Sequence, residues 1–342
     1  MMMRKALGGA VLAAILSVPA GALADDAPAT ASDESVQSYE NTLTVRGYVR
    51  RPFLELTLRH YVPRGEENNS KIIRYAPNTL ANWGGGFSWK GFGLSLGFNA
   101  PRSTKDENLY GKTEYRDFQF YYYSRRFGFD AHYQKYKGFY LLNSRAHGYD
   151  AGDPDTLRPD LAMRSAGFNV FYSFFDSFSF SAAFDQLERQ VSSAWSPLVM
   201  VSGNRFMVCA DRSLIPPAQE SFYGEFAGYR GGDYTGAAVS PGIAYTWIYR
   251  EHFFLTAAGF MGAGWMKKEY TTALGDISEN EGFGKANLRL SLGYNQDSIF
   301  AGFLGTWDIT ASERTLGRRL DRELTEVIAV VINVELYAGV RI

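Results

Sequence analysis

The residues with the clearest chemical potential are charged side chains that stand at alternate positions of otherwise apolar segments. Six of them share the small, polar side of such segments: Asp130, Asp185, Arg289, Asp308, Glu335 and Arg341. Side chains two positions apart point to the same face of a β-strand, so each charge would face away from the apolar side. Because unpaired buried charges are costly, these residues would either pair as salt bridges across a narrow interior or line an aqueous pore. Both signs occur, so no strong ion selectivity is predicted.

His132 is the candidate for acid–base or nucleophilic chemistry. It follows Asp130 by two residues and would share its face of the strand. A hydrolase or acyltransferase embedded in a barrel would pair such a histidine with a serine and with a third residue that orients the ring. The sequence places no serine beside His132 and contains no G-x-S-x-G motif. We therefore favour a polar network over an enzyme and predict no catalytic residue.

The acidic loop at residues 149–155 is the candidate for a metal. Calcium takes six to eight oxygen ligands, often from clustered aspartates. The spacing does not fit an EF-hand, and Pro154 interrupts it, so we favour a solvated loop. The chain has one cysteine and no phosphate-binding or dinucleotide motif. We accordingly predict no metal site and no cofactor.

The first 24 residues have the features of a secretory signal peptide. Arg4 and Lys5 form a positive start, residues 6–18 an apolar stretch, and Ala22-Leu23-Ala24 a cleavage site. A membrane anchor, the alternative, would need roughly 20 apolar residues. Residues 25–40 carry acidic but no basic side chains and predict a flexible periplasmic leader. Residues 41–342 would form the folded domain.

The folded domain alternates large apolar residues with small or polar ones. Along residues 288–295, leucines and a tyrosine alternate with Arg289, Ser291, Gly293 and Asn295, and the last strand has the same pattern. Many segments reach about ten residues, and aromatic residues gather near their ends, as a transmembrane β-barrel requires. The later uncharged runs are too short for a membrane-spanning helix. We predict an all-β, antiparallel, up-and-down barrel in the outer membrane of a Gram-negative cell; a soluble β-sandwich is the structural alternative.

Long and short connections alternate along the chain, which predicts the topology. We expect fourteen strands, with twelve as the alternative, because the pair around Ser202-Gly203-Asn204 is the weakest. Pro241 predicts a bulge or break in its strand. Both termini would face the periplasm, and the C-terminal strand would engage the barrel-assembly machinery. The expected strands are 53–61, 83–90, 92–99, 113–125, 127–136, 166–175, 178–187, 195–202, 205–211, 236–249, 253–268, 284–295, 298–310 and 328–342.

Several short motifs carry a resemblance to a known family. In chain order they are Phe87–Leu94, Tyr110–Thr113, Tyr136–Tyr140, Arg158–Leu161 and Ser213–Pro216. Their order resembles an uncharacterised family of bacterial outer-membrane β-barrels, catalogued as domain of unknown function 4421, over roughly residues 40–342. The resemblance implies an outer-membrane barrel and no activity, and it suggests that Arg158-Pro159-Asp160 orders a loop.

Composition narrows the possible functions. With 35 basic and 36 acidic residues the chain is not a strongly basic nucleic-acid binder, and 46% apolar residues exclude wholesale disorder. Small residues on the inner face predict some open lumen; they are Gly93, Ser95, Gly97, Gly128, Ser179, Ser181, Ser291 and Gly293. We therefore favour a passive channel for small solutes, with membrane lipid as its other partner. The alternatives are a plugged structural or surface-interaction barrel, and an envelope-lipid hydrolase or acyltransferase built around His132.

Overall fold

The computed structural model describes most of the chain beyond the expected signal peptide. The described residues are 35–39, 41–61, 71–79, 81–90, 92–99, 104–150, 152–223, 226–272, 275–311 and 324–342. The predicted signal peptide at residues 1–24 and the first part of the predicted leader, residues 25–34, lie outside them.

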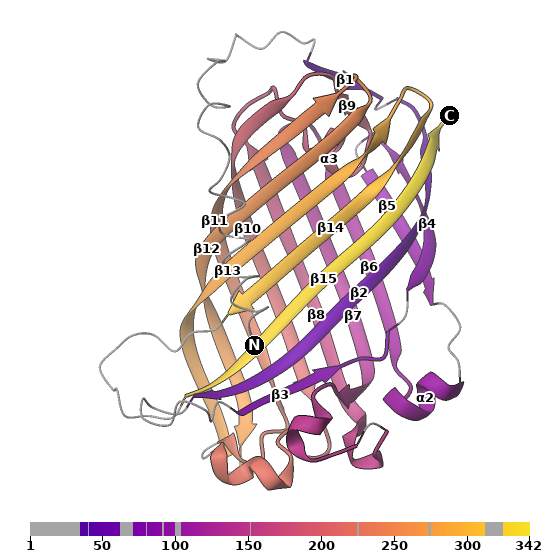
Figure 1. Cartoon of the computed structure of the whole chain (residues 1–342). Helices are drawn as coiled ribbons and strands as arrows, with labels where there is room; N and C mark the ends of the chain where they lie inside the picture. Colours follow the sequence, from indigo (N-terminus) through magenta and orange to yellow (C-terminus); the bar gives the residue numbers. More distant parts are fainter. Residues whose placement is uncertain are drawn as a thin grey trace.

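Twelve antiparallel strands form a closed barrel, in which β15 pairs with β2 to complete the ring (Figure 1). In chain order the wall strands are β2 (Thr44–Tyr61), β4 (Asn82–Trp89), β5 (Phe92–Asn99), β6 (Glu114–Tyr123), β7 (Phe127–Leu141), β8 (Leu157–Ser173), β10 (Ala194–Cys209), β11 (Gly231–Tyr249), β12 (Phe253–Thr272), β13 (Gly275–Asn295), β14 (Ile299–Ala311) and β15 (Leu324–Arg341).

The remaining elements lie at the two ends of the barrel. The short β3 (Lys71–Ala76) pairs with β2 and with the end of β7. The other elements are β1 (Val36–Ser38), α2 (Thr104–Tyr110), α3 (Phe180–Phe184), β9 (Glu188–Gln190) and the 3₁₀ turns η3 (Ser144–His147), η4 (Pro154–Thr156) and η5 (Pro217–Phe222). We call the end that holds α3 and the C-terminus the turn end, and the opposite end, with η3, η4 and η5, the loop end (Figure 1).

The strand number corrects the favoured prediction of fourteen and agrees with the alternative of twelve. The predicted strands 195–202 and 205–211 are one strand, β10, which continues through Ser202-Gly203-Asn204 and pairs with both β8 and β11. The predicted strand 178–187 is not a strand. The side chain of Ser179 accepts a hydrogen bond from the amide of Ala182 (2.9 Å) and starts the helical turn α3 instead.

Two smaller features of the wall also bear on the sequence predictions. The β11–β12 ladder is interrupted between Val239 and Gly242, as Pro241 predicts. Residues 269–283, which separate the predicted strands 253–268 and 284–295, are mostly ladder, because β12 and β13 continue to Thr272 and Gly275.

The outer surface of the barrel is apolar, as the alternating pattern predicts. Large side chains such as Trp83, Phe87, Leu94, Phe168 and Leu336 point outward and are exposed, while their neighbours along each strand face inward. Trp89, Trp247 and Tyr249 are exposed near the turn end, where an aromatic belt at the membrane–water interface would lie. An apolar outside on a closed ring, which leaves no strand edge unpaired, is the architecture of a transmembrane β-barrel.

Among the described residues, no helix has both the length and the apolar character needed to cross a membrane.

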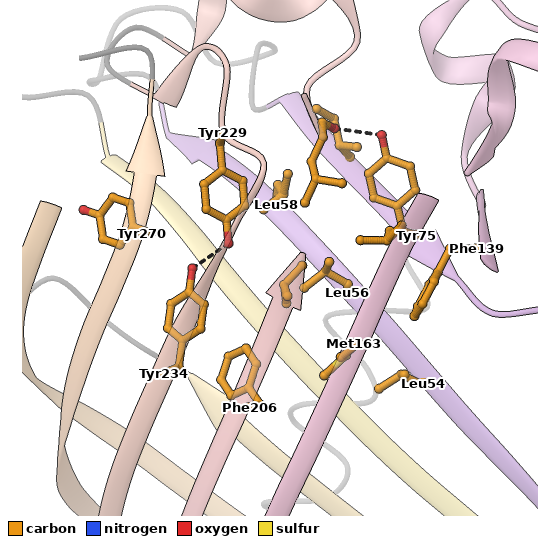
Figure 2. Close-up of a cluster of buried hydrophobic side chains, with 14 of the residues drawn as sticks. Leu54, Leu56, Leu58, Tyr75, Phe139, Met163, Phe206, Tyr229, Tyr234 and Tyr270 are labelled. Carbon is orange, nitrogen blue, oxygen red and sulfur yellow. Dashed lines mark hydrogen bonds between the residues drawn. The ribbon is translucent and has the colours of Figure 1, made fainter. Parts of the chain in front are cut away.

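Apolar clusters fill the barrel at both ends. At the loop end, inward side chains of β2, β8 and β10 pack against the connection between β10 and β11, which buries Leu214, Ile215, Tyr223 and Tyr229. Figure 2 shows this loop-end cluster, with Tyr229 and Tyr234 joined through their hydroxyls (2.6 Å). At the turn end, Phe178, Phe180, Ala183 and Phe184 pack against the inward side chains of the wall. Residues 176–190 are therefore a plug inside the barrel, which we call the turn-end plug.

Candidate functional site

A polar chamber of about 190 Å³ lies inside the barrel between the two apolar clusters. Its wall carries four cationic side chains, Arg46, Arg50, Lys285 and Arg289, and three carboxylates, Asp130, Asp308 and Glu335. His132 lines it as well. The chamber thus contains five of the seven inward polar residues that the sequence analysis singled out, because the alternation of each strand turns them to the same side as the lumen.

Arg289 and Asp130 meet across the barrel from β13 and β7. One guanidinium nitrogen of Arg289 donates to a carboxylate oxygen of Asp130 (2.5 Å), and another donates to the hydroxyl of Tyr123 (3.0 Å). The guanidinium also lies over the ring of Phe171, 4.2 Å from its centre. The ion pair offsets the cost of removing both charges from water.

Asp308 belongs to a second cluster, on neighbouring strands. It accepts hydrogen bonds from Nζ of Lys285 (2.9 Å) and from the amide of Asn287 (3.1 Å). These three residues come from β13 and β14, so the pairing follows from the antiparallel register of those strands.

Glu335 forms the third cluster with two arginines of β2. Arg50 stands directly opposite Glu335 in the β15–β2 ladder and donates to it through Nε (2.8 Å) and Nη2 (2.6 Å). Arg46 approaches the same carboxylate only to 3.7 Å. Its Nε and Nη1 groups have no hydrogen-bond partner, although the side chain is only 6% exposed. The chamber therefore holds one buried guanidinium whose hydrogen-bonding capacity is largely unused.

Both arginines precede residue 53, where the first strand was predicted to begin, so neither was predicted as an inward residue. The signal was present: Arg46, Tyr48 and Arg50 alternate with Val45, Gly47 and Val49 just before the predicted strand. Two adjacent arginines at positions 50 and 51 obscured this period of two.

The structure places Ser165 beside His132, although the sequence predicted no serine there. Nε2 of His132 lies 3.2 Å from the hydroxyl of Ser165, which in turn donates to the side chain of Asn204 (3.2 Å). Ser165 was missed because residues 137–165 were expected to be a loop, whereas β8 begins at Leu157. In the described part of the chain, His132 makes no hydrogen bond to a carboxylate that would orient its ring. The pair is therefore incomplete as a catalytic triad.

Asp185 and Arg341 lie at the turn end, outside the chamber. Asp185 belongs to the turn-end plug rather than to a wall strand, and it accepts hydrogen bonds from Ser181 (2.8 Å) and from the amide of Leu187 (3.0 Å). Its burial raises its pKa to about 7. Arg341 of β15 donates to the carbonyl of Gln186 and to the side chain of Asn295 (2.7 Å), so it fastens the plug to the last strand.

Aromatic rings occupy the space beside several of the small inner-face residues. The ring of Tyr121 lies where a side chain at Gly93 would be, and Tyr123 and Phe171 lie against Gly128 in the same way. Ser179 and Ser181 lie in the plug and are buried. The alternating pattern does not reveal these contacts, because the rings that cover the glycines come from other strands or from more distant positions.

The acidic loop is a local turn in the part that is described. Asp153 caps η4 by accepting a hydrogen bond from the amide of Asp155 (2.9 Å). Over the described residues, no group of three or more His, Cys, Asp or Glu side chains is arranged to hold a metal ion.

A family model covers nearly the whole chain. The model described as "Domain of unknown function (DUF4421)" matches residues 33–339. The chain belongs to the DUF4421 family. The motif-based resemblance is thereby confirmed, and the family description assigns no activity.

The solved structures that match this DUF4421 chain do so at low sequence identity and low TM-score. The outer membrane protease OmpT from Escherichia coli is 11% identical, with 91% of this chain and 99% of that chain covered and a TM-score of 0.40. Ail, the attachment invasion locus protein of Yersinia pestis, is 15% identical over 64% of this chain and 99% of that one, with a TM-score of 0.25. The P. putida toluene transporter TodX is 6% identical over 88% and 89%, with a TM-score of 0.23. No curated protein matches the chain.

In this DUF4421 barrel, Arg158 and Asp160 hold the loop-end cluster in place. Arg158 forms a two-pronged ion pair with Asp160 (2.9 and 2.8 Å) and donates to the carbonyls of Ser213 (2.7 Å) and Arg212 (2.8 Å). The carbonyl of Leu214, in the next family motif, accepts a hydrogen bond from Tyr75 (2.7 Å; Figure 2). The geometry agrees with the loop-ordering role that the resemblance suggests for residues 158–160.

Proposed function

We propose that this protein is a plugged outer-membrane barrel, which encloses a polar chamber and does not act as an open pore. This is the first of the alternatives raised by the sequence. The observation that carries the proposal is the pair of apolar clusters that fill the barrel on either side of the chamber. Export through a cleaved signal peptide at residues 1–24 and insertion by the assembly machinery through β15 belong to the same proposal.

The contacts of the turn-end plug support a stable closure. Ser179 donates to Glu188 (2.5 Å), Asn295 of the wall donates to the carbonyl of Glu188 (3.1 Å), and Arg341 holds the carbonyl of Gln186. The strand β9 of the plug also pairs with β1 from the N-terminal segment. Buried hydrogen bonds to charged groups are among the stronger polar contacts, so a plug with several of them is held firmly.

The proposal is tested by single-channel recording of the refolded mature protein in a planar bilayer. We expect no stepwise current from the wild type. Replacing residues 177–187 with a Gly-Ser linker opens only one end, and replacing residues 214–229 opens only the other, so each single variant should also be silent. The variant with both replacements should conduct. A heat-dependent gel shift verifies the barrel in each case.

Two results would contradict the proposal. Stepwise conductance by the wild type would favour a passive channel, which is the second candidate because the chamber between the plugs is polar and holds both signs of charge. Silence of the folded double variant would show that something other than these two segments closes the lumen.

A further inference from the structure

The barrel wall has one incomplete seam, between β5 and β6. These strands pair at only four positions, from Phe92↔Tyr122 to Ser95↔Gln119. In the described structure, residues 96–99 of β5 and 114–118 of β6 continue past that point without pairing to each other. By contrast, the β12–β13 ladder runs without a break from Phe253↔Tyr294 to Thr272↔Gly275.

A cavity of about 160 Å³ lies at this seam. Its lining includes Leu96 and Phe118, which are 54% and 55% exposed on the lipid-facing side. It also includes Arg50 and Gln119, which line the polar chamber as well. The seam cavity and the chamber therefore adjoin at these two side chains. The seam cavity opens beside the lipid, and the chamber lies inside the barrel.

Polar groups without hydrogen-bond partners line the seam cavity and the adjoining chamber. The side-chain oxygens of Asn82 and Ser95, in the lining of the seam cavity, are buried and have no hydrogen-bond partner. Further in, Arg46 has two unpaired N–H groups, whereas Arg50, Lys285 and Arg289 each lie within 2.9 Å of a carboxylate. Buried polar groups are normally hydrogen-bonded, so the donors of Arg46 and the hydroxyl of Ser95 indicate a ligand with acceptor atoms. The oxygen of Asn82 can only accept a hydrogen bond and does not contribute to this inference.

We propose that the seam between β5 and β6 is a lateral port for an anionic amphiphile dissolved in the membrane. Its anionic head enters the chamber and binds the free N–H groups of Arg46, beside Arg50. Its apolar tail remains at the seam against Leu96 and Phe118. The chamber is too small for a whole lipid. Of its four cationic side chains, Arg46 is the one whose carboxylate partner lies as far away as 3.7 Å, so a single anionic group fits beside it.

The lateral port rests on the closed lumen proposed above. If both ends of the barrel are closed, a ligand reaches the chamber through the barrel wall. The exposed apolar side chains of Leu96 and Phe118 next to a buried guanidinium are the combination that a carboxylate or phosphate with a hydrocarbon tail fits. The partner is thus a membrane amphiphile rather than a water-borne solute.

The test uses a long-chain carboxylate with a photoreactive diazirine on its tail, added to the folded protein in lipid nanodiscs. We expect the label on β5 and β6, at residues 92–99 and 114–122. Arg46→Gln should reduce labelling about tenfold or more, because a charge-assisted contact is lost. Arg51→Gln is the matched control: Arg51 lies on the same strand but on the exposed face, and labelling should be unchanged.

A second pair of variants tests the port without changing the arginines, in a Cys209→Ser background. Leu96→Cys with Phe118→Cys, bridged by a short bis-maleimide, should close the seam and abolish labelling. Leu94→Cys with Phe120→Cys, a pair already opposed in the ladder, should leave labelling intact when bridged. A heat-dependent gel shift verifies that each variant is folded. If Arg46→Gln does not fold, the labelling of the bridged cysteine variants still tests the port.

Equal labelling of all variants, or label spread over the whole outer surface, would overturn the port and indicate annular lipid only. The bilayer recordings separate this failure from failure of the proposed function. A silent wild type without seam labelling refutes the port alone, and a conducting wild type with seam labelling refutes the closed lumen alone. A phosphate monoester with the same tail, used as competitor, distinguishes a carboxylate from a phosphate head.

Discussion

At the scale of single residues, the inside of the barrel is organised by where each charge finds its partner. Glu335 and Arg50, and likewise Lys285 and Asp308, come from adjacent strands, so the ladder itself brings them together. Arg289 and Asp130 come from β13 and β7 and meet across the lumen. An ion pair across the lumen restrains two strands that share no ladder. Its loss should therefore change the cross-section of the barrel more than the loss of an ion pair between adjacent strands does.

Arg158 is the residue whose removal should open the loop end. Arg158→Ala removes a nearly buried two-pronged ion pair and leaves the carbonyls of Arg212 and Ser213 without their donor. We expect the local stability of residues 212–230 to fall by about 2 kcal/mol. Trypsin cleavage after Arg212 and Arg230 in intact proteoliposomes should then accelerate roughly tenfold or more, because cleavage follows the population of the opened loop.

Arg205→Ala is the control for this prediction. Arg205 also forms a two-pronged pair, with Asp233 (2.5 and 3.0 Å), but the arginine is exposed, so its loss should change cleavage little. Arg158→Lys keeps the charge without the forked geometry and should fall between Arg158→Ala and the wild type. Unchanged cleavage of Arg158→Ala would show that the loop end is held by apolar packing alone.

The sequence was sufficient to place Asp130, His132, Arg289, Asp308 and Glu335 inside the barrel, because the period of two in each strand decides the face. It was not sufficient to pair them. Which inward residues meet depends on the register of each ladder and on the barrel's diameter, and neither is encoded locally. Ser165 could not be matched to His132, which it opposes diagonally from the next strand, because it was expected to lie in a loop.

At the scale of elements, the turn-end plug is the feature that local pattern misrepresents. Residues 177–184 alternate serine and phenylalanine at first, as a strand would, but Ser179 caps a helical turn and Phe180 and Phe184 then share one face of it. The intrinsic preference of so short a segment for helix or strand is small, so its packing inside the barrel determines which conformation it adopts. The wall strands were predicted as strands, although the starts of β2, β8 and β13 were each placed nine residues too late.

The plug should be held more tightly at acidic than at basic pH. Burial raises the pKa of Asp185 to about 7 from an ordinary value of 3.8, although Arg46 and the hydrogen bonds from Leu187 and Ser181 oppose the rise. The docked plug therefore favours the protonated form. Its stabilisation is complete below about pH 4 and is lost as pH rises through 7, a difference of at most about 4 kcal/mol.

Hydrogen exchange of residues 178–187, expressed as protection relative to intrinsic rates, measures this effect. Protection should be clearly higher at pH 5.5 than at pH 8 in the wild type and nearly independent of pH in Asp185→Asn. Asp176→Asn, an exposed aspartate of the same connection, should behave as the wild type does. The same pH dependence in Asp185→Asn and the wild type would assign the effect to another group.

At the scale of the whole molecule, the barrel is unevenly closed. From β10 to β15, and across the closure with β2, the strands are long and the ladders nearly continuous. Between β2 and β7 the wall is built instead from the short β4 and β5 and the four-residue junction with β6, with β3 near the loop end (Figure 1). In a closed ring every strand depends on both neighbours, so the shortest junction sets where the ring opens first.

We therefore expect the amides of β5 and of the first half of β6 to exchange faster than those of β12 and β13 in the same detergent micelles. The physical reason is the number of ladder hydrogen bonds that must break for local opening, which is smaller here than at the other described junctions between neighbouring strands of the twelve-stranded ring. Bridging Leu96→Cys to Phe118→Cys should slow exchange at the junction, while the bridge between Leu94→Cys and Phe120→Cys should change it little, because that position is already paired. Equal protection of β5 and β12 in the unbridged protein would mean that the ring is uniformly closed, and that the seam between β5 and β6 does not open in the membrane.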